Sequence, residues 1–300
     1  SRLADLVHAS LTRPDGHGGH VGDLATSWEW TDPRTVVFHL QPRARFSNGT
    51  RLTAVDVAAT LEAVRDPGLG SPRRAALSEI AAVETRDDQT LVIRLQAPSN
   101  SFLDATGIGI VPAALARSST AVTVGAGPFA ITAIDPGERL ELVANPFHDP
   151  VPTLPAITIR IVPDPIVRAL ELRRGSLGCV QETPEPEVLD WLAATPELVV
   201  DRIPGTSFDY LLPNLHDPRL ANRRVRQAVA HAIDRASLTR YLLGNTARVA
   251  SGLLAPAHWA FAPARVARFD PARARRLLAR AGYPDPDGAG PKTAVRHDHN

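Results

Sequence analysis

The sequence feature that most constrains the fold is a repeated hairpin pattern, in which two strand-forming runs flank a tight turn. The paired runs are residues 80–84 with 90–95, and residues 129–134 with 139–144. Asp87-Asp88 marks the first turn, and Asp135-Pro136-Gly137 marks the second. Residues 157–161 add a run in which isoleucine alternates with polar side chains, as in a half-buried strand. Hairpins of this kind predict antiparallel sheets.

Helices are predicted between the strands from residues that cap helix ends. Thr53 followed by Asp56 matches a capping box. Asp164-Pro165 and Asp270-Pro271 each place a cap before a proline at the first helical position. Because capped helices alternate with strands in hairpins, the sequence predicts a mixed α/β (α+β) fold and argues against a helix bundle or a β-sandwich.

Composition narrows the class of protein. The chain has 300 residues, of which 44% are hydrophobic, so it can bury a substantial core in about two domains. The 33 Lys and Arg residues nearly balance the 32 Asp and Glu residues, and the formal net charge is +1. This balance predicts a solvated surface of mixed charge, with no reason to expect nucleic acid or an anionic membrane. The single cysteine, Cys179, excludes an intrachain disulfide and a cysteine-based metal site.

Seven segments carry motifs in a consistent order along the chain. They lie at residues 23–30, 38–50, 52–57, 125–129, 141–146, 224–235 and 270–283. Two examples are Leu52-Thr53-Ala54-Val55-Asp56-Val57 and Gly125-Ala126-Gly127-Pro128-Phe129. Together the segments resemble family 5 of the bacterial extracellular solute-binding proteins, which are the dipeptide-, oligopeptide- and nickel-binding components of ABC importers. One departure is Gly178, which stands where the family has an aspartate.

The resemblance implies a two-lobe fold of the type II periplasmic-binding-protein kind, with the ligand enclosed between the lobes. Residues 1–205 are expected to form the first lobe, with a smaller subdomain at roughly 55–125. Residues 206–300 are expected to begin the second lobe, which this chain leaves incomplete because family members are longer. The boundary is placed near Pro204-Gly205, after a predicted strand at residues 198–203.

The resemblance also implies a function and its partners. The protein is expected to capture a small solute, by default a short peptide, and to deliver it to the permease subunits of an ABC transporter. It is expected to be a monomer, to need no cofactor and to catalyse no reaction. It is expected to be periplasmic or extracellular. Because the chain starts at Ser1 without a signal-peptide pattern, a removed N-terminal segment with a lipid anchor belongs to this expectation. Nickel and other metal chelates, haem, sugars and opines stay open as ligands.

Residues 208–214 are predicted to form a strand that crosses between the lobes. Side chains alternate across a strand, so Phe208, Tyr210 and Asn214 share one face. The resemblance places a similar strand near the ligand, which makes these three residues candidate ligand contacts. The alternative is a core strand in which the Asn214 amide bonds to its neighbours.

Three further residues are candidate ligand contacts. Gly127 and Phe129 lie in the glycine-rich loop that the resemblance places near the cleft, and glycine lets a backbone approach a ligand closely. Trp259 follows a proline-rich loop of the kind found in the family. The alternative for Gly127 and Phe129 is a turn without a ligand role. Trp28 and Trp30 are instead predicted to lie in the core.

Metal binding is one rival function. His17 and His20, and separately His297 and His299, carry imidazoles of the kind that bind nickel. A solvated loop and a free tail explain these histidines without a metal, so no metal ligand is assigned.

A hydrolase and a sensor domain are two other rivals. The sequence contains no Gly-x-Ser-x-Gly, His-Glu-x-x-His or P-loop motif. The neighbouring acids Asp87-Asp88, Glu182, Glu185 and Glu187 fit solvated carboxylates, and Cys179 has no neighbouring base that would activate it. The sequence shows no helix-turn-helix that would link a solute-binding domain to DNA, so no catalytic residue is assigned.

Overall fold

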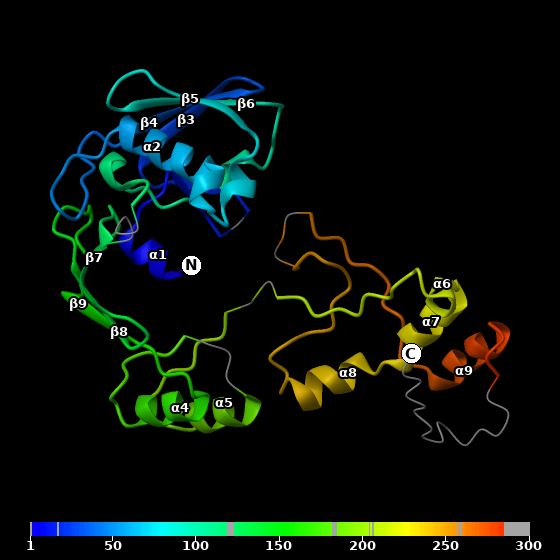
Figure 1. Ribbon diagram of the computed structural model, residues 1–300. Helices are drawn as coiled ribbons and strands as arrows, with labels where there is room; N and C mark the ends of the chain where they lie inside the picture. The colour runs from blue at the N-terminus through cyan, green and yellow to red at the C-terminus, as the bar shows by residue number, and fades with distance from the viewer. Residues whose placement is uncertain are drawn as a thin grey trace. The chain divides into compact units, whose positions relative to one another are not determined.

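A computed structural model describes the chain at residues 2–16, 18–118, 123–181, 185–203, 205, 207–256, 258 and 260–284. Its contacts divide the chain into two units, residues 1–162 and 163–300. Helices and antiparallel strands both occur, which confirms the predicted mixed α/β class (Figure 1). The lobe boundary near residue 205 and the subdomain at 55–125 stay predictions.

The described part of the first unit is built on antiparallel sheets with the strand orders β1-β2, β3-β4-β6-β5 and β7-β8-β9. The strands are β1 (Thr12–Pro14), β2 (His20–Gly22), β3 (Ala25–Asp32), β4 (Thr35–Leu40), β5 (Ile80–Thr85), β6 (Thr90–Leu95), β7 (Phe129–Asp135), β8 (Arg139–Ala144) and β9 (Ala156–Arg160). The helices are α1 (Arg2–Val7), α2 (Ala54–Arg65) and α3 (Phe102–Ala105), with 3-10 turns η1 (Pro67–Leu69), η2 (Arg74–Leu77) and η3 (Ala113–Leu115).

Both predicted hairpins are confirmed. β5 pairs with β6 and closes with Thr85 opposite Leu91, while β7 pairs with β8 and closes with Asp135 opposite Arg139. Gly137 has a φ of 81°, a conformation that glycine adopts without steric cost, so the Asp-Pro-Gly run makes a tight turn. The short turns therefore set the register in which β5 pairs with β6 and β7 pairs with β8.

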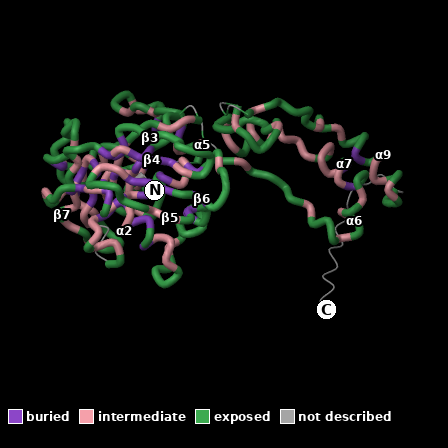
Figure 2. The backbone as a smooth tube through the Cα atoms, turned by 90° about the horizontal axis from the view of Figure 1, so that it is seen from above, coloured by how far each residue is buried: buried purple, intermediate pink, exposed green. Residues whose placement is uncertain are grey.

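The main core of the first unit lies between the four-stranded sheet and α2, and Figure 2 shows buried residues gathered around β3 and β4. Phe38 of β4 and Ile93 of β6 are fully buried, and Val57 of α2 is buried with them. Trp28 packs against Phe38 with ring centroids 6.4 Å apart, as expected for a core residue. Trp30 lies edge-on to the buried Phe102 and stays 40% exposed.

The described part of the second unit is helical. Its elements are α4 (Pro165–Arg173), α5 (Pro186–Ala193), α6 (Pro218–Ala221), α7 (Arg223–Ala232), α8 (Arg235–Ser237), the π-helical turn η5 (Leu238–Leu242) and α9 (Pro271–Arg280). Asp164 and Asp270 accept hydrogen bonds from the first turns of α4 and α9, which confirms these two predicted caps. Asn222 caps α7 in the same way. None of the helices in the described ranges is long and apolar enough to cross a bilayer.

Two predicted strands are wrong. The described residues of 198–203 and 208–214 form no strand. Val199 is 95% exposed and Leu212 is 79% exposed. Residues 198–203 are rich in strand-forming apolar side chains, and residues 208–214 place Phe208 and Tyr210 on one expected face. A strand also needs a neighbouring segment whose backbone N–H and C=O groups pair with its own. No segment in the described part of the second unit pairs with these two runs in a sheet.

The Asp56 carboxylate joins the start of α2 to a distant turn. It accepts from the Thr53 N–H at 2.9 Å and from the Ala113 N–H at 2.8 Å. Replacing Asp56 with alanine should lower the free energy of unfolding by about 2 kcal/mol, because the helix loses its cap and the Ala113 N–H loses its acceptor. Urea unfolding followed by circular dichroism measures this change.

Glu62→Ala is the matched control on the same helix. Glu62 is half exposed and pairs with Arg65 on the surface, so its loss should change stability by less than about 0.5 kcal/mol. Equal destabilisation by Asp56→Ala and Glu62→Ala would contradict the joining role of Asp56.

Candidate functional site

The glycine-rich loop at residues 125–129 packs against the backbone that follows α1. The Gly127 N–H donates to the Val7 carbonyl at 2.8 Å, and the Ser47 N–H donates to the Gly125 carbonyl at 2.8 Å. A Cβ atom on Gly127 would lie 2.6 Å from the Val7 carbonyl carbon. Close approach of the chain to itself therefore explains this glycine. A ligand contact at Gly127 stays a prediction.

Asn145, which directly follows β8, holds the same loop from the other side. Its side chain is buried, and its Nδ2 donates to the Gly127 carbonyl at 2.9 Å. Its Oδ1 accepts from the Phe147 N–H at 3.0 Å, and its backbone N–H donates to the Pro128 carbonyl at 2.9 Å. In the sequence this asparagine stands out only as part of the motif at residues 141–146. An Asn-Pro pair at the end of a strand is the signal for such a bonded turn.

The predicted contact residues are divided between the two units. Gly127 and Phe129 belong to the first unit, Phe208, Tyr210 and Asn214 belong to the second, and Trp259 lies outside the described residues. Phe129 is only 6% exposed and packs in a small cluster with Val7 and Leu142. The joint ligand role of these residues stays a prediction.

Phe208 and Tyr210 form an aromatic pair in the second unit. Their rings stack with centroids 5.6 Å apart and planes 18° apart, so the expected common face of residues 208 and 210 is present although the strand is not. Tyr210 is 67% exposed. Asn214 instead uses its Oδ1 to accept from the His216 N–H at 3.0 Å, which forms a local turn. A ligand role for the stacked pair stays a prediction.

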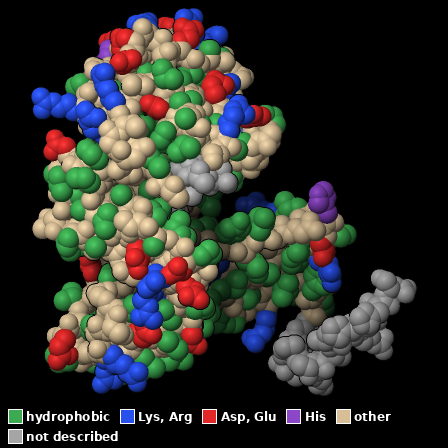
Figure 3. Space-filling model, turned by 60° about the vertical axis from the view of Figure 1, so that its left-hand side comes forward, with side chains coloured by type: hydrophobic (Ala, Val, Ile, Leu, Met, Phe, Trp, Pro, Cys, Tyr) green, Lys and Arg blue, Asp and Glu red, His purple; other side chains and the backbone are tan. Residues whose placement is uncertain are grey.

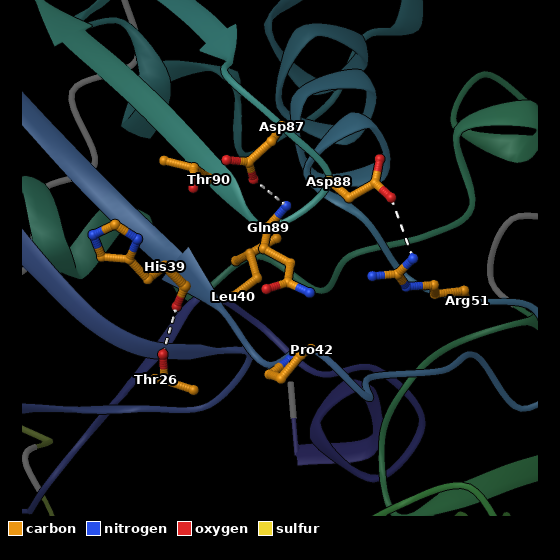
Figure 4. Close-up of a pocket in the computed structure, with 9 residues that line it drawn as sticks. All are labelled: Thr26, His39, Leu40, Pro42, Arg51, Asp87, Asp88, Gln89 and Thr90. Atoms are coloured by element: carbon orange, nitrogen blue, oxygen red, sulfur yellow. Dashed lines mark hydrogen bonds and ion pairs between the residues drawn. The ribbon is translucent and has the colours of Figure 1, made fainter.

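An open pocket of about 640 Å³ lies at one end of the four-stranded sheet (Figure 4). Its lining residues are Thr26, His39, Leu40, Pro42, Arg51, Asp87, Asp88, Gln89 and Thr90. From the sequence, Asp87-Asp88 is recognisable only as a hairpin turn. The lining residues from β3, β4 and residues 42 and 51 could not be predicted, because only the folded sheet brings them next to that turn.

The two carboxylates of this pocket are already bonded to the chain. Asp87 accepts from the Gln89 N–H at 2.7 Å, and this bond, helped by the Thr90 hydroxyl, holds the pKa of Asp87 below its ordinary value. Asp88 pairs with Arg51 at 3.2 Å. The pocket therefore offers polar groups for hydrogen bonding but no carboxylate that is set up as a general base, in line with the predicted solvated turn.

A second, smaller cavity of about 110 Å³ lies in the second unit between α4, α5 and the chain that follows α5. It is lined by Ala169, Leu172, Val180, Leu189, Leu192, Leu198, Val199, Val200 and Asp201. Ligand sites usually enclose roughly 300–1,000 Å³, so this mostly apolar cavity is too small for a drug-sized solute.

The histidines considered as metal ligands have other partners or lie outside the described residues. His20 Nε2 is 3.1 Å from the Asp104 carboxylate. His17, His297 and His299 lie outside the described residues. Within the described ranges no three or more His, Cys, Asp or Glu side chains converge as a metal site would require.

Comparison with known proteins places these features in a family. A model described as bacterial extracellular solute-binding proteins, family 5, middle region, matches residues 20–297. A protein of Brucella ovis named as an ABC transporter peptide-binding protein is 31% identical over 92% of this chain and 55% of its own length. The glutathione-binding protein GsiB of Escherichia coli is 28% identical over 92% of this chain and 55% of its own length.

Solved structures agree with the family match. NikZ from Campylobacter jejuni, crystallised with Ni(L-His), is 27% identical to this chain with a TM-score of 0.80. The match covers 92% of this chain and 58% of NikZ. The chain thus spans about half the length of the curated relatives it matches, and its mixed α/β fold is that of known binding proteins.

Replacing Gly127 with alanine should destabilise the protein by about 2 kcal/mol, because the added Cβ would overlap backbone atoms of Leu6 and Val7. Thermal and urea unfolding measure the loss. Gly178→Ala is the matched control, because a Cβ there meets no atom within 4 Å, and it should change stability by less than about 0.5 kcal/mol. A Gly127→Ala variant with unchanged stability and lost ligand binding would refute the packing explanation.

Proposed function

Because the chain belongs to the family 5 bacterial extracellular solute-binding proteins, we propose that it captures a small solute and delivers it to the permease of an ABC importer. The observation that carries this proposal is the family match over residues 20–297, nearly the whole chain. The order of the motifs from residue 23 to residue 283 agrees with this match. The proposed partners are the membrane subunits of the transporter, with the protein working as a monomer outside the cytoplasm, in the periplasm or held at the membrane by a lipid.

The proposed ligand is a short peptide. Two relatives support this class, since one is named for peptide binding and the other for glutathione, which is itself a tripeptide. The stacked Phe208–Tyr210 pair supports it from this chain's own residues, because an exposed aromatic pair offers a flat apolar surface for peptide side chains. Peptide binding also needs polar groups for the main chain and termini of the ligand.

The proposed mechanism is reversible binding without a covalent step. A solute that binds the closed conformation better than the open one shifts the protein toward the closed conformation, and the permease then receives the closed form. The family matches are to binding proteins, which supports a role outside catalysis.

A metal chelate is the second candidate ligand. NikZ, which is 27% identical to this chain, was crystallised with a nickel–histidine complex. A chelate brings most of its own metal ligands, so binding would not need three converging protein side chains. The stacked aromatic pair would then lie against the organic part of the chelate.

Native mass spectrometry of the protein isolated from the cells that make it tests the ligand class. A family of masses matching di- and tripeptides is the expected result. A single nickel-containing mass would replace the peptide with a chelate. Recovery of a chemically altered ligand after incubation with a defined peptide would contradict the non-catalytic role.

Tyr210→Ala should weaken binding of the identified ligand roughly tenfold, because the variant removes half of the stacked pair. Tyr210 is 67% exposed, so the same variant should leave the unfolding midpoint unchanged. Isothermal titration calorimetry measures the affinity. Tyr241→Ala is the control, since Tyr241 is 74% exposed and lies outside the Phe208–Tyr210 pair, and it should keep wild-type affinity.

A further inference from the structure

Although the net charge is only +1, positive and negative side chains are unevenly distributed along the chain. Residues 218–284 contain 13 arginines, no lysine and two aspartates, a formal charge of +11. The remaining residues therefore carry a formal charge of −10. Acidic and basic side chains are interspersed over the upper part of the view in Figure 3, as the sequence analysis predicted for the whole surface. Residues 218–284 are the exception to that prediction.

The arginines of this stretch concentrate on two helices that pack together, α7 and α9, which lie side by side in Figures 1 and 2. The buried faces of the two helices are apolar, with Val225 and Ala228 on α7 and Ala274 on α9. Both helices are therefore basic and amphipathic, and their apolar faces pack inside the second unit. Their polar faces remain at the surface.

Five exposed arginines form what we call the arginine face: Arg223, Arg224, Arg273, Arg276 and Arg280. The last three are spaced three and four residues apart, so they follow one side of α9. The structure gives no ion pair between the arginine face and any described residue. Like charges on successive turns of one helix repel one another, so an anionic partner would relieve this repulsion.

The two aspartates of this stretch do not neutralise it. Asp234 accepts from the N–H and the hydroxyl of Ser237, and Asp270 accepts from the Arg273 N–H at 2.7 Å. Both carboxylates are thus committed to capping helices. Hydrogen bonds from Ser237 hold the pKa of Asp234 below its ordinary value, so this cap is a carboxylate. Both caps are already counted in the charge of +11, so the guanidinium groups dominate the charge of this stretch.

We propose that the arginine face of α7 and α9 docks on an anionic membrane surface by binding the phosphate groups of lipids. Basic amphipathic helices are typical of membrane-surface binding, and guanidinium groups match phosphate oxygens bidentately. This docking rests on the charge of the chain and does not depend on which solute the protein binds.

Nearby apolar side chains favour a lipid surface over an acidic protein or a nucleic acid. Phe269 just before α9 and Tyr283 just after it are 49% and 46% exposed. Arginine beside exposed tyrosine and phenylalanine suits the boundary between lipid headgroups and acyl chains.

Vesicle co-sedimentation of the purified chain tests the proposal. The chain should bind vesicles of phosphatidylcholine mixed equally with phosphatidylglycerol, and it should not bind vesicles of phosphatidylcholine alone. Binding should disappear at about 1 M sodium chloride, where the screening length falls to about 3 Å. The triple variant R273Q/R276Q/R280Q should bind the anionic vesicles about 100-fold more weakly. It removes three positive charges, and each basic residue near an anionic surface contributes a similar part of the binding free energy.

R13Q/R43Q/R86Q is the matched control, since it removes three exposed arginines of the first unit and changes the net charge equally. It should keep wild-type vesicle binding. Equal loss in both triple variants, or equal binding to both kinds of vesicle, would overturn the proposal. Binding to polyglutamate but not to anionic vesicles would overturn it in favour of an acidic protein partner. If circular dichroism shows that the α9 variant is unfolded, R223Q/R224Q on α7 repeats the test.

Discussion

The first unit depends on a close backbone contact, in which residues 7–8 lie against the glycines of the 125–127 loop. A side chain at Gly127 would overlap the Val7 backbone, and the Gly127 N–H could then no longer reach the Val7 carbonyl. Asn145 holds the carbonyl of the same glycine, and the Ser47 N–H holds the carbonyl of Gly125. These bonds join the N-terminal segment, the loop before β7, the end of β8 and the chain after β4. Because Gly127 has no Cβ atom, these segments, which are far apart in the sequence, can approach closely enough to form the bonds.

The second unit is held in a different way. Its described residues form helices that are capped by Asp164, Asn222 and Asp270, and no sheet connects them. Runs outside these helices, such as 198–203, keep apolar side chains like Val199 and Ile203 at the surface. Capping is a local interaction, so it stabilises each helix without defining a large common core. The first unit, in contrast, combines sheet hydrogen bonds with a continuous cluster of buried side chains.

The sequence was sufficient to predict an element where the residues that form its turn, cap or strand lie within a few positions of each other. The Asp-Pro-Gly turn at 135–137, the Thr53–Asp56 cap and strand β9 all follow from short-range preferences, and the structure contains each of them. The same reasoning was wrong for 208–214. Alternation describes which side chains suit a strand, but backbone hydrogen bonding to a neighbour makes the strand. The pocket beside Asp87-Asp88 was missed for a related reason, because its other lining residues come from distant strands.

The sequence by itself determined the mixed α/β class, the hairpin turns, the helix caps and the family, because turns and caps depend on neighbouring residues and motifs keep their order along the chain. Only the tertiary structure decided why Gly127 is a glycine, what Asn145 bonds, and that the arginines at 223–224 and 273–280 lie on two packed helices. Each of these depends on which distant segments meet, and that is settled by burial of apolar surface over the whole unit rather than by any short stretch of chain.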